Sequence, residues 1–147
     1  MATLEKAIVI AAQAHQNQKD KAGEPYILHP LRMMVKMDSQ VEKLVAVLHD
    51  VVEDSDWTFE QLSREGFAEQ VVEAVKYLTR GEDEDYVAFI ERIQGNRLAI
   101  KVKLADLEDN MDIRRTSRLS EADFDRFKKY HRAWRILKDI EGSGRTG

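Results

Sequence analysis

The sequence contains no cysteine, and this absence excludes disulfide scaffolds, thiolate metal centres and cysteine nucleophiles. Proline and glycine are also scarce, with two and seven among 147 residues, so little interrupts regular secondary structure. A metal site in this chain would have to use histidine, aspartate, glutamate or water.

The chain also lacks a long apolar run and an excess of positive charge. No run approaches the roughly 20 residues that span a membrane, and the short one at residues 7–12 continues in a helical pattern, unlike a signal peptide. A formal net charge of −4 argues against a nucleic-acid partner, which would need a basic face. We therefore expect a cytoplasmic protein with neither membrane nor nucleic acid as partner. Its size predicts one domain over residues 1–141 and a flexible tail over 142–147.

Apolar residues recur at helical spacing along most of the chain, which predicts an all-α fold. Thr3, Ser39, Thr58 and Ser120 are candidate N-caps, and Pro30 suits the first position of a short helix. Residues 100–104 alternate like a strand, but they continue into helix formers beyond a strand's usual length. We expect helices over residues 4–18, 31–37, 40–54, 67–78, 86–93, 97–113 and 121–140, and a further one that begins after Thr58.

Four ionisable residues follow the apolar run at residues 44–48. A helix through this segment places His49 one turn before Glu53, and Asp50 one turn before Asp54. Buried charges are costly unless they are paired or bound to a metal. This cluster is therefore the first indication of a functional site.

His29 and Asp106 are potential metal ligands in other segments. Imidazole and carboxylate together suit Mn(II), Fe(II) or Zn(II) better than Ca(II), which prefers oxygen alone. Each residue also has an ordinary interpretation, since His29 precedes a proline in a turn and Asp106 lies in a predicted helix. Spacing alone indicates a possible metal site, and His15 and His131 are interpreted as structural or exposed.

Three motifs in order make the interpretation more specific. They are Gly23-Glu24-Pro25-Tyr26-Ile27-Leu28-His29-Pro30, Leu48-His49-Asp50-Val51-Val52-Glu53-Asp54 and Val102-Lys103-Leu104-Ala105-Asp106-Leu107-Glu108-Asp109-Asn110. Over residues 5–140 the chain resembles the hydrolase domain of the RelA/SpoT family, and within it the stand-alone small alarmone hydrolases of the HD superfamily. The resemblance implies a compact multi-helix HD-domain bundle that removes pyrophosphate from the 3′ position of the nucleotide (p)ppGpp.

The resemblance also implies roles for individual residues. It assigns one Mn(II) ion to His29, His49, Asp50 and Asp106, although the same ligands could hold Fe(II) or Zn(II). It assigns Glu53 and Asp54 to the attacking water. It assigns Lys19, Lys21 and Asn110 to the nucleotide. Tyr26 could pack against a base or close the core, and Arg114, with the basic residues after it, could bind phosphate or form a solvated basic face.

The sequence departs from the family at three places, of which Ser55 in place of the usual threonine is mild because it keeps the hydroxyl. Asp20 stands where the long bifunctional enzymes commonly have arginine, and Glu108 with Asp109 makes the third motif more acidic, which could weaken binding of a polyphosphate. Two alternatives therefore stay open: hydrolysis of another nucleotide, such as a 2′-phosphorylated dinucleotide or a deoxynucleotide, and a non-catalytic nucleotide-binding module. No counterpart of the synthetase domain is present, so we expect degradation only. The native metal and the oligomeric state are left open.

Overall fold

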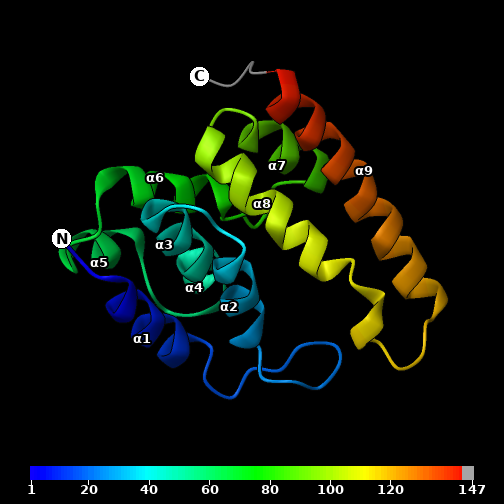
Figure 1. The fold of residues 1–147 in the computed structure, drawn as a ribbon, viewed down its shortest axis with the longest axis horizontal. Coiled ribbons are helices and arrows are strands. Elements are labelled where there is room, and N and C mark those ends of the chain that lie inside the picture. Colours follow the sequence, from blue (N-terminus) through cyan, green and yellow to red (C-terminus); the bar gives the residue numbers. More distant parts are fainter. Residues whose placement is uncertain (144–147) are drawn as a thin grey trace.

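Helices joined by loops make up residues 1–143, which are the part of the chain that the computed structural model describes (Figure 1). The all-α prediction is therefore confirmed, and the segment around residues 100–104 is helical. No helix within this described part is long and apolar enough to cross a membrane. The elements are α1 (Leu4–Ala14), α2 (Leu28–Val35), α3 (Gln40–Leu48), α4 (Val51–Asp54), α5 (Phe59–Arg64), α6 (Glu69–Leu78), α7 (Tyr86–Ile93), α8 (Arg97–Asn110), the 3₁₀ turn η1 (Ile113–Arg115) and α9 (Glu121–Ser143).

The predicted caps begin their helices. The Ser39 hydroxyl accepts a hydrogen bond from the Glu42 backbone N–H at 3.2 Å, and the Glu42 carboxylate accepts one from the Ser39 N–H at 3.0 Å. Thr58 and Gln61 form the same reciprocal pair at the start of α5, as their spacing predicts. Each cap satisfies backbone donors that have no partner within the helix.

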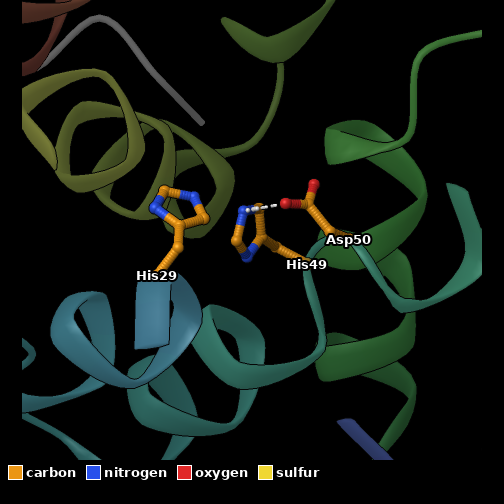
Figure 2. Close-up of side chains that lie close together, drawn as sticks. All are labelled: His29, His49 and Asp50. Atoms are coloured by element: carbon orange, nitrogen blue, oxygen red, sulfur yellow. Dashed lines mark ion pairs between the residues drawn. The ribbon is translucent and has the colours of Figure 1, made fainter. Parts of the chain in front are cut away.

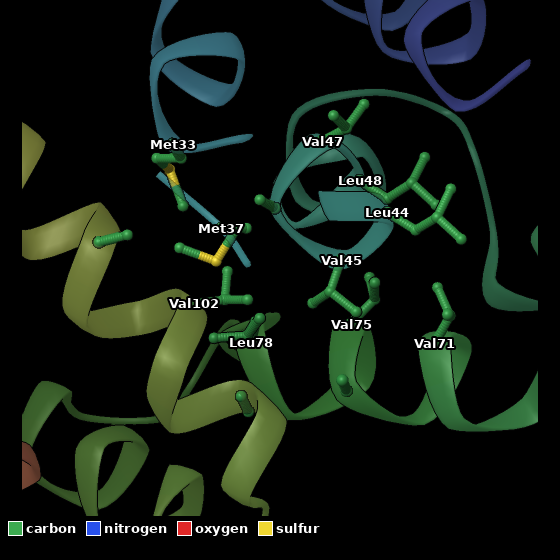
Figure 3. Close-up of a cluster of buried hydrophobic side chains, with 14 of the residues drawn as sticks. Met33, Met37, Leu44, Val45, Val47, Leu48, Val71, Val75, Leu78 and Val102 are labelled. Atoms are coloured by element: carbon green, nitrogen blue, oxygen red, sulfur yellow. The ribbon is translucent and has the colours of Figure 1, made fainter. Parts of the chain in front are cut away.

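Helix α3 lies at the centre of the bundle, where it packs against α1, α2, α6 and α8. Its residues 44–48 are all buried, as expected for a helix that is apolar on every side. Figure 3 shows Val45 of α3 facing Val75 of α6, with Met37 and Val102 on the neighbouring side. This core holds the end of α3 firmly in place.

Several predicted boundaries were wrong by a few residues. Helix α1 ends at Ala14 rather than residue 18, because Asn17 adopts a left-handed backbone (φ 68°) that turns the chain. Helix α2 begins at Leu28, so Pro30 occupies its third position rather than its first. Proline is tolerated there because the N–H groups of the first helical positions have no acceptor within the helix. Helix α6 begins at Glu69, two residues later than predicted.

The C-terminal elements also differ from the prediction. Helix α8 ends at Asn110, three residues before the predicted end, and η1 begins at Ile113. Ser120 and Asp123 hydrogen-bond reciprocally at the start of α9, which continues to Ser143. Residues 142 and 143 are therefore helical instead of beginning the predicted tail, and the rest of that tail, residues 144–147, lies outside the described residues.

Candidate metal and nucleotide site

The predicted continuous helix over residues 40–54 is interrupted at His49 and Asp50. Helix α3 ends at Leu48, the Asp50 backbone leaves helical geometry (φ −107°, ψ 1°), and α4 begins at Val51. His49 is only 2% exposed, whereas Glu53 lies at the exposed end of α4. The break therefore leaves the His49 imidazole in the core and brings the Glu53 carboxylate into contact with solvent.

The structure brings His29, His49 and Asp50 together from α2 and from the α3–α4 junction (Figure 2). One potential ligand atom of each lies within 4.8 Å of the others. Asp106 of α8 is not in that group of three, but its Oδ1 lies 2.9 Å from His29 Nε2 and 3.8 Å from His49 Nε2. All four predicted ligands therefore surround one small volume.

The hydrogen bonds of His49 direct a lone pair into this volume. Its Nδ1 lies 2.7 Å from the Ala46 carbonyl, which can only accept, so Nδ1 carries the proton. Its Nε2 is buried without a hydrogen-bond partner among the described residues and lies 2.9 Å from Asp50 Oδ2. A lone pair that faces a carboxylate requires a cation between them. The donor set therefore fits a divalent ion.

In the protein without a metal, a proton would fill that role. Burial by itself lowers the pKa of His49, but the carboxylates of Asp50 and Asp106 outweigh burial and raise this pKa well above its ordinary value. The same His49 lowers the pKa of Asp50, although burial opposes this. The Tyr26 hydroxyl donates a hydrogen bond to Asp50 Oδ2 and so holds this carboxylate in place.

Glu53 and Asp54 lie beside the cluster as acids with raised pKa values. Loss of hydration within the cleft is the largest cause for both, although each side chain remains partly in contact with solvent. The charge of Asp50 adds to it, and for Asp54 the charge of Glu53 also contributes. The pKa of Asp54 rises to about 6. Glu53 is held by the Arg80 backbone N–H, which donates to its Oε1 at 2.9 Å. Carboxyls with pKa values near the working pH suit proton transfer.

A cleft of about 350 Å³ is lined by these acids and by the cations Arg80, Lys103 and Lys129. Lys103 Nζ lies 2.7 Å from Asp106 Oδ2, and Lys129 Nζ lies 4.6 Å from the centre of the Tyr86 ring. Arg80 lies over the same ring at 5.6 Å. Within residues 1–143, Lys129 forms no ion pair, and the buried Tyr86 hydroxyl has no hydrogen-bond partner. Lys103 already has Asp106 as a counterion, whereas the charge of Lys129 is available to an anionic ligand in the cleft.

A second hollow of about 360 Å³ adjoins the first and shares three lining residues with it: Tyr26, Asn110 and Tyr130. Lys19 and Lys21 line this hollow, as the resemblance implies for nucleotide-binding residues. Their loop is ordered by Asp20, whose Oδ1 accepts hydrogen bonds from the N–H groups of Ala22 and Glu24, both at 2.9 Å. Asp20 therefore has a structural role in shaping the loop, apart from any effect on the ligand.

Of the two interpretations left open for Arg114, its position agrees with the solvated basic residue. Its side chain is 86% exposed, pairs with Asp112 at 2.7 Å and is absent from the lining of both hollows. Arg115 and Arg126 line the second hollow instead. Sequence reasoning missed Arg126, although its four-residue spacing from Tyr130 on α9 predicts that both share one face.

The two extra acids of the third motif, Glu108 and Asp109, line neither hollow. Glu108 accepts a hydrogen bond from Trp134 Nε1 at 2.9 Å, on the side of α8 that packs against α9. Asp109 is 3% exposed and is paired with His29, Arg32 and Arg115. The concern that these acids weaken polyphosphate binding is therefore not supported by their positions.

Comparison with known proteins identifies relatives over most of the chain. Residues 7–110 match the HD domain family. A guanosine-3′,5′-bis(diphosphate) 3′-pyrophosphohydrolase of Aquifex aeolicus is 34% identical over 121 residues, or 74% of this chain. The bifunctional (p)ppGpp synthase/hydrolase SpoT of Escherichia coli is 34% identical over 123 residues. The chain spans only 17% of the length of each of these two relatives.

A solved structure described as a metazoan ortholog of SpoT that hydrolyses ppGpp has a similar fold. The TM-score is 0.75 at 22% sequence identity, and the match covers 96% of this chain and 90% of the other. This likeness supports the helical arrangement, while the sequence match over residues 7–110 identifies the family. The chain belongs to the HD domain family.

Proposed function

We propose that this chain is a metal-dependent phosphohydrolase that removes pyrophosphate from the 3′ position of (p)ppGpp. One observation carries the proposal: a His/Asp cluster and two acids of raised pKa share a cleft with cations, and this cleft adjoins a second hollow lined by basic residues. A nucleotide with a diphosphate at each end of its ribose would need positive charge on both sides of the metal. Two relatives at 34% identity are named for hydrolysis of this nucleotide, which supports the choice of substrate.

His29, His49, Asp50 and Asp106 would hold the ion, and we propose Mn(II), with Fe(II) and Zn(II) able to use the same ligands. When bound, the ion would polarise a phosphoryl oxygen and lower the pKa of water. Such an ion would also explain why the buried side chains of His29, His49 and Asp106 can lie so close together.

The side chains around the ion would position the nucleotide and accept a proton. Asp54, assisted by Glu53, accepts the proton of a water whose oxygen forms a bond to phosphorus. The bond between that phosphorus and the ribose 3′ oxygen breaks, and the 3′ oxygen takes up a proton, by way of Asp54 or solvent, to become a hydroxyl. Pyrophosphate is released, and GDP remains from ppGpp or GTP from pppGpp. Lys103 and Lys129 neutralise the diphosphate that departs, while Lys19 lies with Lys21 in the other hollow.

The same proposal covers the setting of the activity. We propose that residues 1–141 work as one HD hydrolase domain in the cytoplasm, on a small-molecule nucleotide. The net charge of −4 supports neither nucleic acid nor an anionic membrane as a partner.

Purified protein with Mn(II) and ppGpp is expected to release pyrophosphate and GDP in equal amounts, measured by ion-exchange chromatography. A 2′-phosphorylated dinucleotide and a deoxynucleoside triphosphate, assayed in parallel, are expected to be poorer substrates. If either of these nucleotides is hydrolysed faster than ppGpp, it would be assigned as the substrate in place of ppGpp. Tight ppGpp binding without turnover would indicate a non-catalytic module.

Metal removal is expected to destabilise the fold. An ion that binds only the folded state adds about 2.7 kcal/mol at 100 times its Kd. For a chain of this size, that corresponds to a rise in Tm of about 5–10 °C. Differential scanning fluorimetry of chelator-treated protein, with and without Mn(II), measures this shift. An unchanged Tm, together with no bound metal in equilibrium dialysis, would contradict the metal site.

Lys129→Met is expected to raise KM for ppGpp by about 3–10-fold, with a smaller change in kcat, because it removes about 1 kcal/mol of charge interaction. The effect should shrink in high salt, since the side chain is exposed. Lys128→Met is the matched control, because Lys128 is also exposed but lines neither hollow. Equal changes in both variants would show that Lys129 contributes only to the overall charge.

A further inference from the structure

Asp109 is a buried carboxylate that the proposed chemistry does not use. Both of its oxygens accept hydrogen bonds: Oδ2 from His29 Nδ1 at 2.6 Å, and Oδ1 from Arg32 Nε at 2.8 Å. A second nitrogen of Arg32 donates to Oδ2 at 2.9 Å, and Arg115 approaches Oδ1 at 3.3 Å. A side chain that is only 3% exposed thus has a full set of charged partners.

Two arginines keep this carboxylate ionised. Arginine stays protonated in proteins, and the forked contact with Arg32 uses both oxygens of the carboxylate. An ionised carboxylate can only accept hydrogen bonds, so the His29 nitrogen that faces it must donate. His29 Nδ1 therefore carries a proton, and in the neutral ring the lone pair is on Nε2.

That lone pair points toward the candidate metal position. His29 Nε2 lies 2.9 Å from Asp106 Oδ1, and its ring centre lies 5.4 Å from that of His49. His29 and Arg32 are one turn apart on α2, and Asp106 and Asp109 are one turn apart on α8. The packing of α2 against α8 thus places a ligand and its supporting group on each helix.

We propose that Asp109, fixed by Arg32 and Arg115, is a positioning residue that sets the tautomer and the orientation of His29 for metal binding. The inference rests on the proposed function, since it assigns His29 to the ion. It gives the acidic third motif a role at the metal rather than at the nucleotide. Arg115 also lines the second hollow, so this support extends from the ligand to the nucleotide side.

Mn(II) binding without nucleotide separates this role from simple stabilisation. Asp109→Leu is expected to raise the Kd for Mn(II) by about 10–100-fold, the usual effect of losing a group that orients a ligand. Asp109→Asn keeps an acceptor and should fall between Asp109→Leu and the wild type. Leu62→Ala is the matched control, because this buried α5 residue contributes to the core away from the cluster. It should lower Tm and leave the Kd unchanged.

A spectroscopic readout follows the tautomer directly. In ¹⁵N-labelled protein loaded with diamagnetic Zn(II), His29 should show a protected Nδ1–H signal, which Asp109→Leu loses. An unchanged Kd and an unchanged Nδ1–H signal in Asp109→Leu would overturn the proposal. If Asp109→Leu does not fold, Arg115→Gln should raise the Kd by a smaller factor, and no rise would overturn the proposal equally. Metal results as expected, without any ppGpp hydrolysis, would reject only the proposed function.

Discussion

Asp50→Asn is expected to lower kcat/KM for ppGpp by about 10³-fold or more. The substitution removes one negative charge from the metal ligands, and a catalytic ion contributes several kcal/mol of transition-state stabilisation. It also changes the acceptor of the Tyr26 hydroxyl and the group that faces His49 Nε2. Pyrophosphate release over a range of Mn(II) concentrations measures the loss.

The control for Asp50→Asn is Asp38→Asn, the same chemical change at an 80% exposed side chain that pairs with Lys101. Asp38→Asn should keep both the activity and the rise of Tm with Mn(II). Asp50→Asn should lose both, although the fold persists in circular dichroism. Activity within about tenfold of the wild type at saturating Mn(II) would contradict the assignment of Asp50 as a ligand.

The sequence predicted the helices well because their signals are local. Ser39 with Glu42, and Thr58 with Gln61, form the caps that their spacing predicts. The break at Asp50 has no such signal, since residues 40–54 contain neither glycine nor proline. It follows from tertiary demands, because His49 must stay in the core while the next turn reaches solvent.

The candidate ligands were also predictable, since motif resemblance gave His29 and Asp106 as well as the central pair. Their supporting groups were not. In the sequence, Asp109 has no evident role and only adds negative charge to the third motif. The packing of α2 against α8 brings it into contact with His29. Arg114 and Arg115 differ by one position on a 3₁₀ turn, which decides whether the side chain enters the hollow. The direction in which each of these two side chains leaves the turn depends on the tertiary packing and has no local sequence signal.

Asp54→Asn is expected to lower kcat by about 10²–10⁴-fold, the usual contribution of a positioned acid or base. The amide cannot accept a proton, and its size leaves the cleft nearly unchanged. Substrate binding should change little, so KM should stay near that of the wild type. Single-turnover measurements at pH 7.5 separate the chemical step from product release.

The same variant should make the metal-free protein more stable at neutral pH. The pKa of Asp54 rises from 3.8 to about 6 on folding, chiefly through burial, so its charge opposes folding. This penalty is absent below about pH 3.8, grows between pH 3.8 and 6, and is complete above pH 6. The shift corresponds to about 3 kcal/mol, which solvent screening at this exposed side chain reduces to about 1–2 kcal/mol.

Urea unfolding with a chelator at pH 4 and pH 7.5 tests this dependence. Asp54→Asn should match the wild type near pH 4 and exceed its stability by about 1–2 kcal/mol at pH 7.5. Added Mn(II) should narrow the difference, because the ion offsets the repulsion between Asp50 and Asp54. A variant that is inactive but no more stable than the wild type at pH 7.5 would show that the ionised Asp54 carboxylate does not lower the free energy of unfolding. If Asp54→Asn instead keeps its activity, the proton transfer would fall to Glu53, whose pKa is also raised mainly by burial.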